Sequence, residues 1–389
     1  MVIFDFCVSV IGMTPRTVVE TLWRNIPEAA RECFEESHLT AMVSALSLEP
    51  AEEIRATCAA FMKRIRQVNH LRGLDYAPQR SEEWLNQRKN LLTASDLASA
   101  LNKGKFCTRS ALLKKKAEAR RPAAPVSAVP EEAPPPVTAG LPAFKSPALA
   151  WGTMFEPMIA RIYSEMNNDI ELYEFGLVQH PTLTCFGASP DGITELGRML
   201  EIKCPWRRVI EPGVVPEQYM LQIQGQLAVC GLDECDYLEV VMEDIPDEET
   251  YYRMVDAKET HAHGVIVELQ TSKEQSSNDQ HYEYSPPKLT PKKAYRWAKK
   301  NIQKWIAQDP TINIMRIRPW KMKAMNLVPV AFDGTLWDSL VPLIRQFWAD
   351  VEEKTLDVPV APTTAGADEP KVTRPRKQKK FSYRDDDDV

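Results

Sequence analysis

The sequence predicts an α/β fold, in which a central mixed β-sheet is flanked by helices, with an added helical region at the N-terminus. From residue 151 onward, segments with apolar residues at helical spacing alternate with short apolar segments typical of strands. This order of helix, strands, helix and strand is typical of an α/β core. The chain has 389 residues, of which 44% are hydrophobic and 26% charged, so it has the composition of a globular protein with room for a full catalytic core.

Residues 1–75 are expected to form a helical accessory region. Thr14 is suited to cap a first helix, and Pro15 suits its first turn. Apolar residues at helical spacing indicate a second helix further on, at Ile54, Cys58, Phe61 and Ile65.

The main core is expected over residues 76–355. Near its start, Ser95 is a candidate N-cap for a helix. Residues 122–147 are rich in proline and alanine, which predicts a disordered insertion. Residues 245–325 form an expanded region, and the basic and acidic tail at 356–389 is expected to be disordered.

The elements of the core follow from hydrophobic periodicity. Helices are expected at 151–163, 218–230, 294–307 and 336–351. Strands are expected at 171–178, 184–188, 198–202, 237–242 and 328–332. The polar segment 270–280 is expected to be a loop.

Charge and cysteine content constrain the partners and the compartment. The net charge of −6 would by itself disfavour binding to nucleic acid. Part of the acidic excess lies in the run at 385–388, however, so a locally basic groove elsewhere in the protein remains compatible with the sequence. Eight cysteines without paired spacings predict free thiols in a reducing, intracellular compartment. No segment approaches the ~18 apolar residues that span a bilayer, so no membrane association is expected. The basic run at 371–380 has the composition of a nuclear-import signal, and equally of a disordered electrostatic tail.

The candidate catalytic residues surround one short predicted strand. Glu201 and Lys203 alternate along it and should project from one face, while Ile202 points into the core. If Asp191 lies on the neighbouring strand, two carboxylates and an ammonium meet at one point. Glu156, on a predicted helix between small neighbours, has the space to join them.

This set of residues suits metal-assisted hydrolysis of a phosphodiester. Carboxylate oxygens are ligands for Mg²⁺, and Mn²⁺ accepts the same ligands, so the choice of metal stays open. A lysine beside them can orient or help to deprotonate the attacking water. Tyr219, Gln222 and Gln226 lie along one side of the next helix and are candidates to contact that water or the DNA backbone, or else to be buried structural residues. Taken alone, an Asp followed by Glu-x-Lys also arises on solvated strand edges.

Five blocks in order resemble the phage lambda exonuclease and YqaJ-type viral recombinase family of the PD-(D/E)XK nuclease superfamily. They are Trp84–Arg88 with Leu92–Ser95, Ala148–Glu156, Ser189–Gly192, Leu200–Pro205, and Tyr219–Gln224. The resemblance implies a restriction-endonuclease-like core. It also implies a DNA substrate and an origin in a virus or mobile element.

The resemblance also assigns roles to individual residues. It implies that Asp191, Glu201 and the Ile202 carbonyl ligate Mg²⁺, that Glu156 completes the metal shell, and that Lys203 serves the attacking water. Gln222 matches a glutamine near the family's active site. Arg88 and Ser95 match its pocket for a 5′-terminal phosphate, and Tyr219 is placed with the DNA contacts.

The function implied is a 5′-to-3′ exonuclease on linear double-stranded DNA, which leaves a 3′ single strand for an annealing protein in recombination or end processing. The family forms ring-shaped trimers, but the added N-terminal region, the insertion and the expansion at 245–325 are departures that put this assembly in doubt. Two alternatives stay open. One is an endonuclease, or a nuclease acting on RNA, of the same fold, and the other is a DNA-binding scaffold without catalysis.

Overall fold

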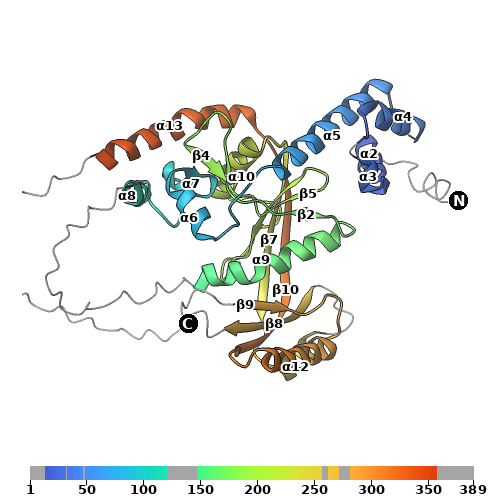
Figure 1. Cartoon of the computed structure of the whole chain (residues 1–389), viewed down its shortest axis with the longest axis vertical. Coiled ribbons are helices and arrows are strands. Elements are labelled where there is room, and N and C mark those ends of the chain that lie inside the picture. The colour runs from blue at the N-terminus through green and yellow to red at the C-terminus, as the bar shows by residue number, and fades with distance from the viewer. Residues whose placement is uncertain are drawn as a thin grey trace, which may run out of the picture.

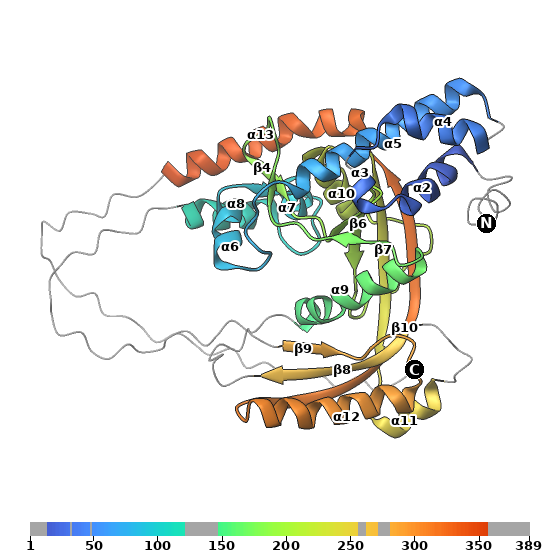
Figure 2. The same cartoon turned by 45° about the vertical axis from the view of Figure 1, so that its right-hand side comes forward.

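The computed structural model describes residues 14–31, 33–46, 49–120, 147–255, 262–270 and 281–356. Figures 1 and 2 show helices on both sides of a long, curved sheet. The predicted insertion before Pro147, the loop at 271–280 and the tail with its basic run lie outside the described residues. Within them, no helix is long and apolar enough to cross a membrane.

A seven-stranded mixed sheet forms the centre of the fold, which confirms the predicted α/β class. Its strands in spatial order are β2 (Leu172–Tyr173), β5 (Gly192–Thr194), β6 (Met199–Lys203), β7 (Glu234–Asp244), β10 (Asn313–Ala331), β8 (His263–Gln270) and β9 (His281–Tyr284). The pair β6 and β7 is parallel, and the other neighbours are antiparallel. A smaller sheet contains β1 (Leu92–Thr93), β4 (Phe186–Ala188) and β3 (Val178–Gln179). The segment expected as one strand at 171–178 is therefore split between the two sheets.

Strand β10 is much longer than the strand predicted at 328–332. Its second half pairs with β7 and its first half with β8, and a register shift interrupts each pairing. The shifts break the alternation of apolar and polar residues, and Pro319 within the strand argues against a strand in the sequence. The region 245–325 thus contributes ordered strands, together with α11 (Glu248–Met254) and α12 (Pro291–Gln308).

The four helices predicted in the core are present as α9 (Pro147–Met166), α10 (Glu217–Cys230), α12 and α13 (Gly334–Leu356). The core also contains α6 (Glu82–Lys89), α7 (Ala94–Ala100) and α8 (Arg109–Arg120), of which α8 was not predicted. The expectation that Ser95 caps α7 is wrong, because Thr93 has the extended backbone of the N-cap and Ser95 lies in the first turn.

The N-terminal helices share a hydrophobic cluster with the core. They are α2 (Pro15–Asn25), α3 (Glu28–Arg31), α4 (Glu36–Leu46) and α5 (Ala51–Arg72), and Thr14 caps α2 as predicted. Val18 of α2 and Phe61 of α5 share one hydrophobic cluster with Phe155 of α9 and Leu200 of β6. A second cluster on the other side of the sheet joins α7, α10 and α13. The N-terminal region therefore completes the packing around the helix and strand that carry the candidate site.

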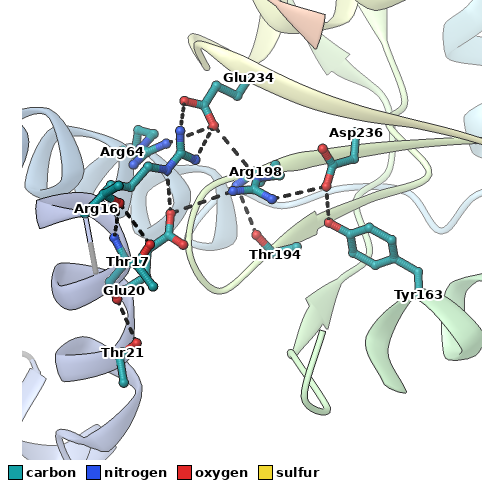
Figure 3. A network of polar contacts seen from close by, with 11 residues as sticks. Arg16, Thr17, Glu20, Thr21, Arg64, Tyr163, Thr194, Arg198, Glu234 and Asp236 are labelled. Carbon is teal, nitrogen blue, oxygen red and sulfur yellow. Dashed lines mark hydrogen bonds and ion pairs between the residues drawn. The ribbon is translucent and has the colours of Figure 1, made fainter. Parts of the chain in front are cut away.

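An ion-pair network fixes α2 and α5 to the beginning of β6 and β7 (Figure 3). The Arg16 guanidinium donates to both carboxylate oxygens of Glu234, at 2.7 and 2.5 Å. Arg64 lies 3.2 Å from the same carboxylate and Arg198 lies 3.8 Å from it. Arg198 also donates to Asp236, which accepts a 2.6 Å hydrogen bond from the Tyr163 hydroxyl of α9. Glu234 is the carboxylate that the three guanidinium groups share.

Replacing Glu234 with glutamine should lower the free energy of unfolding by about 1–3 kcal/mol, because three partly buried guanidinium groups lose their common counter-charge. Urea unfolding followed by circular dichroism measures this. The matched control is Glu36→Gln, which removes a pair with Arg66 whose two side chains are 43% and 65% exposed. It should change stability by less than about 0.5 kcal/mol. Equal effects of the two substitutions would contradict a stabilising role for the network.

Candidate active site

The antiparallel pair β5 and β6 brings Asp191 to Glu201 and Lys203. Asp191 directly precedes β5, and Gly192 is in register with Leu200 of β6. The Asp191 carboxylate accepts a 2.7 Å hydrogen bond from the backbone N–H of Ile202. The Ile202 side chain is buried in the core below. The structure therefore places Asp191 directly before the strand that neighbours β6, close to Glu201 as the sequence predicted.

The Glu201 carboxylate is fully buried and surrounded by donors. Its side chain is 0% exposed, and the Lys203 ammonium donates to it from two residues along the strand. Gln222 and Gln226, one turn apart on α10, donate to its two oxygens at 2.7 Å each. A buried carboxylate needs such partners, because its desolvation is otherwise costly. The two glutamines thus fix the orientation of the carboxylate, and Gln226 contributes one hydrogen bond to it, as Gln222 does.

Glu156 reaches the site from α9. Its carboxylate accepts a 2.9 Å hydrogen bond from Arg80, and the Glu156 side chain is 34% exposed. Arg80 has a left-handed backbone with φ of 70°, directly before the start of α6. This backbone conformation is uncommon for residues other than glycine, and nothing in the sequence around Arg80 predicts its contact with Glu156. Arg80 was therefore missed.

The pKa values of the site residues are shifted because several carboxylates lie close together where little water reaches them. Burial raises the pKa of Asp191 well above its usual range, and the charge of Glu201 adds to this. Burial likewise raises the pKa of Glu156, against the effect of Arg80. For Lys203, burial lowers the pKa, but the carboxylates of Glu201 and Asp191 outweigh it and the net shift is upward. Lys203 is thus held as an ammonium, and added positive charge would stabilise the carboxylates.

The donor set suits a hard divalent cation. In the described residues, no three of the histidine, cysteine, aspartate and glutamate side chains close around a common point. Glu201 is engaged by Lys203 and two glutamines, and Glu156 by Arg80. Mg²⁺ needs only one or two protein carboxylates together with water and phosphate oxygens. The residues that would hold it are Asp191, Glu201 and Glu156, whose repulsion a cation relieves.

Tyr219 lies beside Lys203. The Lys203 ammonium is 4.9 Å from the centroid of the Tyr219 ring, and the Arg208 guanidinium is 5.3 Å from it. The ring also stacks on Tyr237 at 5.9 Å. Tyr219 therefore lies close to the site, as expected, and Arg208 is an additional cation that sequence reasoning missed.

A second polar cluster forms where Arg88, in the last turn of α6, meets the start of α7. Its guanidinium donates to the hydroxyls of Ser95 at 3.1 Å and Thr93 at 3.3 Å. It also lies 4.3 Å from the ring centroid of Trp84, whose indole N–H donates to the Ser189 hydroxyl at 3.0 Å. Arg88 and Ser95 are therefore in contact, and Ser189 is two residues before Asp191. Thr93 is a further hydroxyl of this cluster that the sequence did not single out.

A known viral protein is similar to a large part of this chain. A curated relative, the uncharacterized protein R354 of Acanthamoeba polyphaga mimivirus, is 25% identical over 323 residues, which are 74% of this chain and 55% of that protein. The chain thus spans about half the length of this relative.

Two solved structures are similar at low identity. The alkaline exonuclease LHK-Exo of Laribacter hongkongensis is 19% identical with a TM-score of 0.40, over 71% of this chain and 95% of that one. A phage-related exonuclease from Haemophilus somnus 129PT is 12% identical with a TM-score of 0.34, over 68% and 93%.

The family comparison covers the site itself. The matched segment runs from α6 to the loop before β7, and it includes Arg88, Glu156, Asp191, Glu201 and Lys203. Residues 83–233 match the YqaJ-like viral recombinase domain, and the resemblance predicted from the motifs is confirmed.

Proposed function

We propose that this protein is a metal-dependent exonuclease that degrades linear double-stranded DNA from 5′ ends and leaves a 3′ single strand for recombination or end processing. The observation that carries the proposal is the buried Glu201 carboxylate, held by Lys203, Gln222 and Gln226 next to Asp191. A structural strand has no need for two neighbouring buried acids and an ammonium. The match of residues 83–233 to a YqaJ-like viral recombinase domain supports the same reading.

The chain's own residues divide the work of hydrolysis. Lys203 is held between Glu201 and the Tyr219 ring, so its ammonium donates hydrogen bonds and orients the attacking water or a phosphate oxygen. Gln222 and Gln226 keep Glu201 in one orientation. A bound Mg²⁺ or Mn²⁺ would polarise the scissile phosphate and stabilise the charge that develops on it.

The cluster around Arg88 accounts for a preference for 5′-terminal phosphate. A guanidinium gives two parallel hydrogen bonds to phosphate, and the hydroxyl of Ser95 beside it is an additional donor. The Thr93 hydroxyl accepts from Arg88 and donates to Asp96, so it orients the guanidinium. Trp84 lies on the face of the guanidinium, which fixes its plane. The link from Trp84 to Ser189 connects this pocket to the segment that carries Asp191.

The direct test is digestion of three substrates, with Mg²⁺ or with EDTA: linear duplex with a 5′-phosphate, linear duplex with a 5′-hydroxyl, and a closed circle. The expected result is Mg²⁺-dependent loss of the 5′-phosphorylated linear duplex, with the circle intact. Cutting of the circle would show an endonuclease instead. DNA binding without cutting in either Mg²⁺ or Mn²⁺ would indicate a scaffold.

Replacing Arg88 with alanine should remove the preference for phosphorylated ends. Hydrogen bonds to charged groups contribute about 1.5–3 kcal/mol, so the ratio of kcat/KM for 5′-phosphate over 5′-hydroxyl should fall by roughly 10- to 150-fold. Digestion of the two duplexes side by side measures this ratio. Arg66→Ala, which removes an exposed arginine of α5, is the control and should leave the ratio unchanged. If Arg88→Ala leaves the ratio of kcat/KM for the two duplexes unchanged, Arg88 does not bind the 5′-phosphate. That result would not contradict the proposed catalytic role of the carboxylates and Lys203.

A further inference from the structure

We infer that a groove beside the candidate active site binds an unpaired nucleic-acid strand. This inference rests on the proposed function, because it concerns the path of the substrate next to the hydrolysed bond. The groove has a volume of about 880 Å³ and lies between α9, the segment that follows β6, and strands β7, β8 and β10. We call it the basic groove, and its defining residues are Trp151, Trp206, Arg207, Arg208, Arg318 and Lys323.

The basic groove adjoins the site directly. It begins where β6 ends, three residues after Lys203, and Arg208 in its wall shares the Tyr219 ring with Lys203. The wall of the groove that carries Arg208 therefore lies next to Lys203, and a strand that leaves the site on this side meets the groove.

The charges of the groove favour a polyanion. Its lining includes five cationic side chains and three carboxylates, although the whole chain has a net charge of −6. Asp244 already pairs with Arg316 and Arg318, and Glu268 pairs with Arg318 at 2.6 Å. Arg207 and Lys323 have no ion pair within the described part of the chain and are exposed. They are the cations free to contact phosphates.

The aromatic and apolar part of the lining favours unpaired bases. Trp206 is 39% exposed, and the Arg207 guanidinium stacks 4.1 Å from its ring centroid. Val209, three residues further on, is 90% exposed. An exposed tryptophan paired with a cation is a platform on which a base can stack, and stacking needs bases that are not held inside a duplex. The combination therefore fits single-stranded nucleic acid better than a duplex.

The test compares wild type with a Trp206→Ala/Arg207→Ala double variant of the full chain, in EDTA so that no cleavage occurs. Fluorescence anisotropy with a labelled single-stranded oligonucleotide and with a blunt duplex gives the two affinities. Single-strand affinity should fall on the order of 5- to 150-fold, and duplex affinity by less than about threefold. Loss of the arginine contact should also reduce the slope of log affinity against log salt concentration by about 0.7.

The matched control is Arg66→Ala/Phe106→Ala, which removes an exposed arginine and an aromatic residue that is 88% exposed, both outside the groove. It should bind as wild type does. Arg207→Ala alone tests the groove without touching the tryptophan, and circular dichroism checks that each variant is folded. Unchanged single-strand binding in folded double and single variants overturns the inference, and so does an equal loss for both nucleic acids. Binding is measured here without cleavage. If the wild-type protein proved unable to cleave DNA, the proposed function would be wrong, but the binding of a single strand in the basic groove would still be tested.

Discussion

Replacing Lys203 with alanine should reduce DNA hydrolysis by on the order of 10²- to 10⁴-fold, the range expected for a group that orients or protonates the reacting atoms. The ammonium is the charged partner of the buried Glu201 and lies over Tyr219. Without it, Gln222 and Gln226 still donate to both oxygens of Glu201. The carboxylate therefore stays satisfied and the variant should fold. Release of acid-soluble nucleotides from linear duplex in Mg²⁺ measures the rate, and anisotropy in EDTA measures DNA binding.

The matched control is Lys63→Ala, which removes an exposed lysine of α5 and should leave the rate unchanged. Lys203→Arg is informative as well, because it keeps the charge but replaces a compact ammonium with a planar fork. We expect it to remain strongly impaired, since the space between Glu201 and Tyr219 fits the smaller group. A folded Lys203→Ala protein that retains more than a tenth of the wild-type rate would contradict the proposed role of this lysine.

The parts of the fold that the sequence predicts have apolar residues at a regular spacing. In α9 these residues recur at helical spacing, and β6 is a short apolar segment bounded by turn residues. Strand β10 was largely missed because both of its edges are paired and its residues alternate irregularly across two register shifts. Strand β8 pairs with β10, and β9 pairs with β8 at the edge of the sheet, so the place of both strands depends on a partner more than 40 residues further along the chain.

The site was predictable where local spacing fixes the geometry. Alternation along β6 places Glu201 beside Lys203, and helical spacing on α10 places Gln222 with Gln226. The contacts that sequence reasoning missed join residues far apart in the chain. Arg80 meets Glu156 across 76 positions, and the link between Trp84 and Ser189 spans 105. Spacing rules do not reach such contacts, because tertiary packing alone brings these residues together.

Replacing Asp191 with asparagine should have opposite effects with and without metal. Asparagine keeps a carbonyl oxygen for the Ile202 N–H but removes the charge. Burial and the neighbouring Glu201 raise the pKa of Asp191, so its ionisation costs more free energy in the folded protein than in the unfolded chain. In EDTA the variant should therefore be as stable as wild type or more stable. Thermal unfolding in EDTA measures this first effect.

With Mg²⁺ the order should reverse. A ligand that binds only the folded state stabilises it by about 2.7 kcal/mol at one hundred times its dissociation constant, so wild type should unfold at a higher temperature as Mg²⁺ is added. Loss of the Asp191 carboxylate should weaken metal binding by at least about 10- to 100-fold and remove most of that shift. The Mg²⁺ concentration for half-maximal hydrolysis should rise in parallel. Asp338→Asn, at an exposed position of α13, is the control that keeps the wild-type response. Equal Mg²⁺ stabilisation of wild type and Asp191→Asn would exclude Asp191 as a ligand and leave Glu201 and Glu156 to hold the ion.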